Sequence, residues 1–425
     1  MMRNNEKKHP ALRVILSIVA AIVVLAVGGA CVYTRFGGFG TGECADVDEF
    51  SKYAGAVCDI SIPDETRVVA LGEATHGNSE FQQLRLDVFK VLVERYGVRA
   101  FALEADFGAC EGINRYIHGE EGSAAKALAA TGFAIYRTQE MEDLVEWMRD
   151  YNTKVQTDKL SFYGFDMEQY AYSFRYLLDE LKKENADTTE LESIWDDKKG
   201  AYRQKYSAKE RSEIIEKVKD EIPEDNAWAR QLAAVLIQNI ELGKYIDDSG
   251  ELNEHRDSMM EQNILWISQR ERALGNECII ISGHNNHVMK CESPGMVGMG
   301  ALLAKELKNG YYVIGTDFYK STCNLPKPFT GKRFTHVFYS YDPLAKAAKK
   351  CGFDVSFLDF SKIPETSALN EQLSGEICMG SLGESYSILM DFMPKSYRVM
   401  RTPRAAYDAM IFVTDARPIE IKPAE

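Results

Sequence analysis

The segment GEATHG at residues 72–77 places a carboxylate and an imidazole three positions apart. A neutral imidazole is an effective general base near neutral pH, and a nearby carboxylate can hold it in orientation. We therefore predict that His76 is a general base and that Glu73 orients it. A helix is expected directly after this turn, and its positive N-terminal end should disfavour the imidazolium form of His76. The glycines at both ends of the segment let the backbone turn tightly beside a substrate.

A second segment, GHNNH at residues 283–287, carries two more of the seven histidines. We predict that His284 and His287 supply hydrogen bonds or positive charge to a developing oxyanion, and that Arg85 does the same. Glu104 directly follows the apolar run RAFAL, where a carboxylate must find a partner or become protonated. We predict that Glu104 holds one of these cations in place.

Three more charged residues are predicted to bind the substrate. Asp106 and Asp166 follow apolar runs, and Arg256 stands with Asp257 at the start of a long amphipathic stretch. An adjacent Arg-Asp pair at the start of a helix is also commonly structural, so this pair admits both interpretations.

These residues need a scaffold that brings them together, and the hydrophobic pattern predicts one. Short apolar runs alternate with amphipathic stretches, which is the pattern of strands joined by helices in a parallel sheet. Nearly continuous apolar runs are typical of strands that are covered on both faces. In open α/β sheets, ligands bind beyond the carboxyl ends of the strands, where five of these runs have ionisable residues. The predicted strands are 67–71, 99–103, 160–165, 278–282, 311–314 and 409–413.

The predicted fold class is therefore α/β, with a parallel-rich central sheet flanked by helices, an inserted helical subdomain and an N-terminal transmembrane helix. Residues 186–250 are dense in charge and then apolar and helical, so we predict that they form the insertion within one domain at 44–425. A set of ordinary crossover helices is the alternative. Other helices are predicted from their spacing at 79–96, 140–151, 170–183 and 254–274.

The N-terminal residues predict a membrane segment. Residues 14–33 contain a long uncharged apolar stretch of the length that spans a bilayer as a helix. Basic residues precede it, so the positive-inside rule places residues 1–13 in the cytoplasm and predicts a single-pass protein of the cell membrane with an extracytoplasmic catalytic domain. A cleaved signal peptide, which would give a secreted protein, is the alternative. Residues 34–43 are rich in glycine and predict a flexible tether.

Composition argues against several classes of function. With 50 Lys and Arg against 64 Asp and Glu, the formal net charge is −14, which argues against a nucleic-acid partner. None of the nine cysteines belongs to a C-x-x-C pair, so metal-ribbon and thioredoxin-like sites lose their main support. The sequence has no G-x-S-x-G elbow and no P-loop, and no cofactor or metal is predicted. The oligomeric state is left open.

An ordered set of motifs runs from about residue 44 to residue 417. It consists of GEATHG with Glu80, Arg85, Glu104, GFD at 164–166, Arg256-Asp257 with Met260 and Asn263, GHNNH, and YDAMIFV at 407–413. This set resembles the erythromycin esterase family. The resemblance implies an α/β core with a helical insertion, and a hydrolase that opens a macrolide lactone without a covalent enzyme intermediate. It also implies that His76 is the base and that Glu73, Arg85, Glu104, His284 and His287 support it.

The predicted activity is hydrolysis of a carboxylic ester or macrolide-type lactone, a small-molecule substrate, by water that His76 activates. Two other functions would use the same residues. Three imidazoles and a carboxylate can bind catalytic Zn²⁺, so a zinc-dependent hydrolase at His76, His284 and His287 is one alternative. A non-enzymatic protein that binds haem or a cell-envelope glycan is the other.

Overall fold

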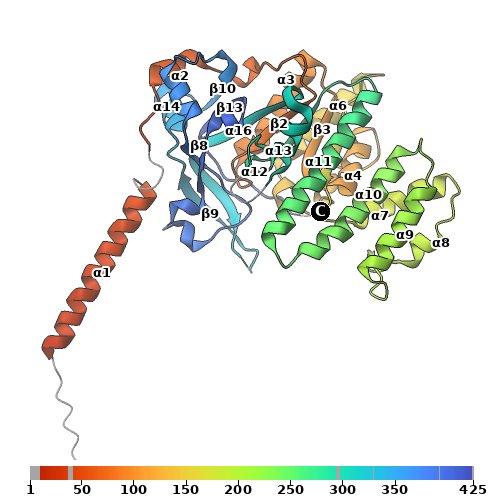
Figure 1. Cartoon of the computed structure of the whole chain (residues 1–425), viewed down its shortest axis with the longest axis horizontal. Helices are drawn as coiled ribbons and strands as arrows, with labels where there is room; N and C mark the ends of the chain where they lie inside the picture. Colours follow the sequence, from red (N-terminus) through yellow and green to blue (C-terminus); the bar gives the residue numbers. More distant parts are fainter. Residues whose placement is uncertain (1–9, 37–41, 293–296, 329, 392, 424–425) are drawn as a thin grey trace, which may run out of the picture.

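The computed structural model describes residues 10–36, 42–292, 297–328, 330–391 and 393–423, without the side chains of 10–13, 31 and 34–36. The described residues form a nine-stranded sheet with helices on both faces (Figure 1). The strand order is β1-β10-β13-β8-β2-β7-β3-β4, and β9 pairs with β8. The six neighbouring strands from β13 to β4 are parallel, and the pairs made by β1, β9 and β10 are antiparallel. This is the mixed α/β fold with a mostly parallel sheet that the sequence predicts.

All six predicted strands are present, and they form the parallel part of the sheet. The antiparallel edge strands were not predicted. The main sheet contains β1 (Ala54–Gly55), β2 (Val68–Glu73), β3 (Ala100–Asp106), β4 (Ser161–Asp166), β7 (Ile279–His284), β8 (Tyr311–Pro326), β9 (Arg333–Tyr339), β10 (Val355–Asp359) and β13 (Ala409–Ala416). Two short hairpins lie outside it, namely β5 (Trp195–Asp196) with β6 (Ala201–Tyr202), and β11 (Ile377–Gly380) with β12 (Arg398–Arg401).

Helices connect the parallel strands and cover both faces of the sheet. They are α1 (Pro10–Phe36), α2 (Val47–Tyr53), α3 (Ser79–Tyr96), α4 (Phe107–Ile117), α5 (Ala124–Ala129), α6 (Gln139–Lys154), α7 (Ala171–Lys183), α8 (Thr189–Ser193), α9 (Ala208–Glu221), α10 (Ala227–Leu242), α11 (Ser249–Ala273), α12 (Asn285–Val288), α13 (Met299–Leu307), α14 (Pro343–Cys351), α15 (Ala368–Ser374) and α16 (Pro403–Ala406).

Successive residues of the central strands alternate between the two faces of the sheet. In β2, Val68 and Ala70 belong to one core with residues of α11 and α13. Val69 and Leu71 belong to a second core with residues of α3 and α6. These four side chains are at most 2% exposed. Coverage on both faces explains why the strand sequences are continuously apolar rather than alternating.

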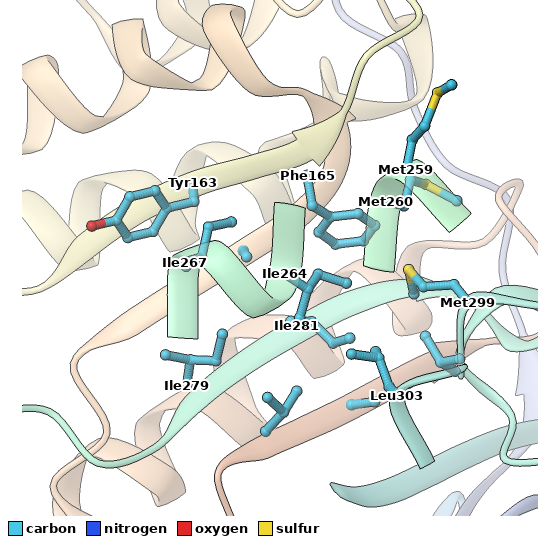
Figure 2. Close-up of a cluster of buried hydrophobic side chains, with 14 of the residues drawn as sticks. Tyr163, Phe165, Met259, Met260, Ile264, Ile267, Ile279, Ile281, Met299 and Leu303 are labelled. Atoms are coloured by element: carbon cyan, nitrogen blue, oxygen red, sulfur yellow. The ribbon is translucent and has the colours of Figure 1, made fainter. Parts of the chain in front are cut away.

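Figure 2 shows the core between α11 and the sheet. Ile264 and Ile267 of α11 face Ile279 and Ile281 of β7, and Phe165 near the end of β4 lies beside them. All five side chains are at most 1% exposed. Because this packing fixes α11 on the sheet, it also fixes the charged residues near the start of α11, which contribute to the candidate site.

The chain between β4 and β7 is mostly helical. It contains α7 to α11 and the small β5-β6 hairpin, and Figure 1 shows α7 to α10 together at one side of the molecule. Helix α10 packs against α7 and α9. Helices α8, α9 and α10 fall within the predicted insertion at 186–250. That these helices form a separate subdomain within the domain at 44–425 stays a prediction.

The N-terminal segment forms α1, which projects from the rest of the molecule in Figure 1. Its continuous run of described side chains extends from residue 14 to residue 30. A bilayer core of about 30 Å calls for about 20 apolar residues in a helix.

Among the residues that the structure describes, no helix is both long enough and apolar enough to cross a membrane. The predicted transmembrane anchor at 14–33 is therefore wrong. The predicted membrane contact and the predicted single-pass location both depended on that anchor, so they are wrong for the same reason. The predicted segments 1–13 and 34–43 lie largely outside the described residues.

The packing predicts how strongly β7 contributes to stability. Ile281 is 0% exposed, so Ile281→Ala should leave a cavity and lower the free energy of unfolding by about 2–5 kcal/mol. Urea denaturation followed by circular dichroism measures this change. Leu274, directly after α11, is 65% exposed. Leu274→Ala is the control and should change the free energy by less than about 0.5 kcal/mol. Equal losses in the two variants would contradict the core assignment of Ile281.

Candidate active site

Parallel pairing of β2, β7 and β3 gathers polar side chains at the carboxyl ends of these strands. Glu73, the last residue of β2, pairs in register with His284, the last residue of β7. Strand β3 lies on the other side of β7, and the carboxylate of Glu104 accepts a hydrogen bond from the backbone N–H of His284 at 2.7 Å. Acids and imidazoles therefore lie side by side at this edge of the sheet.

Glu73 is the centre of a buried ion-pair network. Nδ1 of His76 lies 2.8 Å from Oε2 of Glu73, and Nη2 of Arg85 donates to the same oxygen at 2.9 Å. Glu73 is 2% exposed and Arg85 is 1% exposed. An ionised carboxylate only accepts hydrogen bonds, so His76 donates through its Nδ1–H. The lone pair of the neutral ring is therefore on Nε2.

Arg85 is held in place by several neutral groups. Its Nε donates to the hydroxyl of Ser282 at 3.0 Å, its Nη1 donates to Gln82, and its guanidinium lies 5.4 Å from the centre of the Tyr136 ring. The Tyr136 hydroxyl in turn donates to the backbone carbonyl of Glu104 at 2.7 Å. This geometry directs the charge of Arg85 toward Glu73 rather than toward a ligand.

The pKa of His76 is shifted in the direction opposite to the one expected from the helix that follows it. Burial lowers the pKa of His76, but the Glu73 carboxylate outweighs this effect and raises the pKa above its usual 6.5. The helix that follows, α3, was expected to favour the neutral ring. A helix end is equivalent to only about half a charge, whereas Glu73 carries a full charge in direct contact with the ring. The carboxylate therefore decides the direction of the shift.

His287 is enclosed by two carboxylates. Its Nδ1 lies 2.5 Å from Oδ1 of Asp257, and its Nε2 lies 3.4 Å from Oε1 of Glu104. Burial lowers the pKa of His287, but the charges of Glu104 and Asp257 raise it above the usual value. Both ring nitrogens face acceptors, and only the imidazolium ion can donate from both. The two contacts and the direction of the pKa shift therefore both favour the imidazolium form of His287.

His284 is a neutral ring with a defined tautomer. Its Nδ1 accepts a hydrogen bond from the backbone N–H of Asn286 at 3.3 Å. Burial, followed by the nearby charges of His76 and His287, lowers the pKa of His284 well below its usual value. The single ring proton is therefore on Nε2. Among the described residues, this buried Nε2 has no hydrogen-bond partner. The ring centres of His284 and His76 are 5.1 Å apart.

Glu104 connects this cluster to Arg256. Nη2 of Arg256 lies 3.2 Å from Oε1 of Glu104, and its Nε lies 3.1 Å from Oδ2 of Asp166. Burial raises the pKa of Glu104, but His287 and Arg256 outweigh it and hold the pKa below the usual range. Glu104 is therefore ionised between two cations. The side chain of Arg256 is 13% exposed, so part of it borders the solvent.

Asp166 and Asp106 are both fully buried. Asp166 binds Arg256, as described above. Asp106 is the N-cap of α4 and accepts the backbone N–H of Ala109 at 2.7 Å. Burial raises the pKa of Asp106 to about 7. The structure therefore gives these two carboxylates partners inside the protein, and their predicted contact with a substrate stays a prediction.

Segments that are distant in sequence hold the His76 turn in place by hydrogen bonds. The backbone N–H groups of Asn324 and Ile419 both donate to the carbonyl of Gly77, each at 3.0 Å. The side chain of Asn78 donates to the carbonyl of Arg417 at 2.8 Å, across 339 residues of sequence. A Cβ on Gly77 would lie 2.9 Å from the carbonyl oxygen of Asn324. Glycine is thus needed at this position for close packing.

Within the described part of the chain, no group of three or more His, Cys, Asp or Glu side chains is arranged to hold a metal ion. Carboxylates already engage the Nδ1 atoms of His76 and His287. The eight cysteines whose side chains are described are free thiols.

Several residues that shape this site were not predicted from the sequence. Ser282, Gln82 and Tyr136 position Arg85, and Asn286 fixes the tautomer of His284. Gln82 and Arg85 are three residues apart in a predicted helix and therefore share a face, which could have indicated their contact. Nothing in the sequence pattern indicates Tyr136, because it approaches from the short 3₁₀ turn Ala134–Tyr136.

The family model described as Erythromycin esterase matches residues 93–416, which is more than half of the chain. The matched range includes Glu104, Arg256 and the GHNNH segment. Glu73, His76 and Arg85 lie before it.

Two relatives match most of the chain. An erythromycin esterase type II of Escherichia coli is 24% identical over 351 residues, which are 71% of this chain and 82% of the relative. A putative hydrolase of Bacillus subtilis (strain 168), YbfO, is 23% identical over 341 residues, which are 69% of this chain and 74% of the relative. The family match and these relatives place the chain among the hydrolases.

Solved structures share the fold. A succinoglycan biosynthesis protein has a TM-score of 0.72 at 20% identity, covering 88% of this chain and 98% of its own. A Bacillus cereus protein also has a TM-score of 0.72 at 20% identity, covering 89% of this chain and 100% of its own. A mutant of the erythromycin esterase EreC in its open conformation has a TM-score of 0.56 at 18% identity, covering 83% of this chain and 91% of its own.

The hydrogen bonds predict different charge states for the three histidines. Ring ¹⁵N NMR of histidine-labelled protein should show that His76 and His287 titrate above pH 6.5, and that His284 keeps a neutral Nε2–H ring well below pH 6.5. Glu73→Gln should lower the pKa of His76, because it removes the adjacent negative charge. The control is Glu80→Gln, since Glu80 pairs with Arg417 instead. An imidazolium at His284 at pH 7 would contradict the assigned tautomer.

Proposed function

The chain belongs to the erythromycin esterase family, and we propose on this premise that it hydrolyses a carboxylic ester or macrolide-type lactone with water that His76 activates. The name of the Escherichia coli relative supports an ester or lactone as the substrate. The histidine cluster supports the chemistry, because it combines a candidate base, a neutral hydrogen-bond donor and a ring whose contacts favour a positive charge.

The orientation of His76 is the observation that carries this proposal. Glu73 occupies Nδ1, so the basic lone pair of the neutral ring is on Nε2, and the side chain is 12% exposed. Among the described residues, no Ser, Thr or Cys side chain hydrogen-bonds to the His76 ring. A side-chain nucleophile would need such contact with the base. Direct attack by water is therefore the simpler reaction at this site.

Hydrolysis at this site involves two proton transfers. Nε2 of His76 removes a proton from water while the water oxygen bonds to the carbonyl carbon, which gives a tetrahedral oxyanion. The imidazolium then returns this proton to the alcohol oxygen as the carbon–oxygen bond of the ester breaks. The products are the carboxylic acid and the alcohol. Glu73 stabilises the intermediate imidazolium, and Arg85 keeps Glu73 ionised and in position.

His284 is the proposed donor to the oxyanion. Its Nε2–H has no acceptor within the part of the chain that the structure describes, and a substrate oxygen would supply one. One preorganised donor of this kind typically contributes about 10²–10³-fold to the rate. Because Nε2 is buried in the structure, the substrate has to open the rim of the site to reach it.

His287 and Arg256 supply positive charge behind this donor. The ring centres of His284 and His287 are 6.5 Å apart, so His287 acts on the oxyanion through its electric field. Glu104 lies between His287 and Arg256 and holds both in place. These residues are proposed to position and polarise the site, whereas His76 and His284 are proposed to contact the reacting atoms.

Substitution of the base tests the proposal. His76→Gln should lower kcat/KM by about 10²–10⁴-fold, because positioned base catalysis contributes that much. The assay is a panel of macrolides and simple esters, followed by mass spectrometry for the gain of one water. His118→Gln changes an exposed histidine and is the control. If His76→Gln kept more than about a tenth of the activity, the residue would not be the base.

The pH dependence of the reaction follows from the pKa of His76. A base works only when deprotonated, so kcat/KM should rise with pH through a midpoint above 6.5, the direction in which Glu73 shifts the pKa. Glu73→Gln should move this midpoint to lower pH and also lower the plateau, because the ring loses its orienting partner. A midpoint that stays in place in Glu73→Gln would mean that another group controls the reaction.

A further inference from the structure

A cavity of about 740 Å³ lies beside the GHNNH segment, outside the histidine cluster. This volume is in the range of sites that bind small organic ligands. The cavity lies between the end of α12 and the β12–α16 segment. The lining residues that matter to the argument are Asn286, Met289, Val399, Met400 and Arg401.

Arg401 is a buried cation without a carboxylate partner among the described residues. It is 8% exposed, and its guanidinium donates to two neutral oxygens, at 2.9 Å to the Tyr407 hydroxyl and also to the side-chain oxygen of Asn286. The other buried arginines of the site are each paired, Arg85 with Glu73 and Arg256 with Asp166. A buried charge without a counter-ion is costly, and an anion beside it removes that cost.

A single residue connects Arg401 to the proposed oxyanion donor. The side chain of Asn286 accepts a hydrogen bond from Arg401, and its backbone N–H donates to Nδ1 of His284 at 3.3 Å. A group bound to Arg401 therefore lies close to the place where the ester carbonyl is proposed to react. Met289, Val399 and Met400 give the cavity an apolar part of its wall.

We propose that this cavity binds the acid part of ester substrates that carry a free carboxylate, such as monoesters of dicarboxylic acids. The carboxylate binds the guanidinium of Arg401, whose planar N–H groups match a carboxylate, and the apolar chain lies against Met289 and Val399. This inference rests on the proposed hydrolase function and adds a substrate class to it.

Two glutamates, Glu292 and Glu376, also line the cavity and would repel an anion. Both are exposed, so water and salt screen their charges. The charge of Arg401 is buried and is screened much less. The cation therefore dominates the field at the point where Arg401 borders the cavity.

Two esters that differ only in charge test the inference. One is the 4-nitrophenyl monoester of adipic acid, which has a free carboxylate, and the other is the same ester with that carboxylate methylated. The wild-type protein should have at least about a tenfold higher kcat/KM for the charged ester, since hydrogen bonds to charged groups are worth at least that factor.

Substitutions of Arg401 should change this preference. Arg401→Gln should reduce the ratio of the two kcat/KM values at least about tenfold, and Arg401→Lys should retain part of the preference because it keeps the charge. Arg404→Gln is the control, because Arg404 borders a different cavity and lies over the ring of Phe360. The control should keep the wild-type ratio.

A binding measurement separates the inference from the proposed reaction. Calorimetry measures the binding of the N-methyl monoamide of adipic acid, which keeps the free carboxylate but is not an ester. The measurement is made on the single variant His76→Gln and on the double variant that carries both His76→Gln and Arg401→Gln. If neither ester is hydrolysed but the amide binds and Arg401→Gln weakens binding at least about tenfold, the cavity assignment holds and the hydrolase proposal fails. If both esters are hydrolysed equally well and Arg401→Gln leaves their ratio unchanged, the cavity assignment is overturned and the hydrolase proposal stands. Failure of the amide to bind His76→Gln also overturns the cavity assignment.

Discussion

The carboxylate of Glu73 lies where water hardly reaches, and the contacts that it makes there organise the rest of the site. Two groups from different elements bind it, namely Arg85 from α3 and His76 from the turn after β2. A buried carboxylate without such partners would become protonated or destabilise the fold. The guanidinium of Arg85 and the ring of His76 therefore meet at the same oxygen atom. The orientation of the proposed base thus depends on this carboxylate.

The three histidines show how much the surroundings of an imidazole decide its chemistry. His76 has one carboxylate partner, His287 has two, and His284 accepts a backbone N–H instead. The same residue type is therefore proposed to act as a base at His76, as a cation at His287 and as a neutral donor at His284. The fold sets the surroundings of each ring before a substrate binds, so the site does not have to reorganise its charges during the reaction.

The parts of the fold that could be predicted were those with a strong local pattern. The central strands are apolar on both faces, and the carboxyl ends of parallel strands meet at one edge, so the gathering of Glu73, Glu104 and His284 followed from the pattern. The edge strands β1 and β9 were missed because one has two residues and the other is largely exposed or half-buried.

Other features depend on contacts that no local pattern contains. The partners of Arg85 come from separate segments, and the sequence pattern did not show that Asp106 is the N-cap of α4. The predicted transmembrane segment was wrong, because none of the described helices is long and apolar enough to cross a membrane.

The hydrogen bonds that hold the His76 turn come in part from the C-terminal segment, so they form only after that segment has been synthesised. Gly77 and Asn78 depend on hydrogen bonds from Ile419 and to Arg417, which a ribosome adds more than three hundred residues later. A nascent polypeptide that lacks those residues cannot complete the turn. The proposed active site is thus completed late in biosynthesis, after almost the whole domain has been translated, and proteolytic removal of this distal segment would take away the hydrogen bonds that hold the turn.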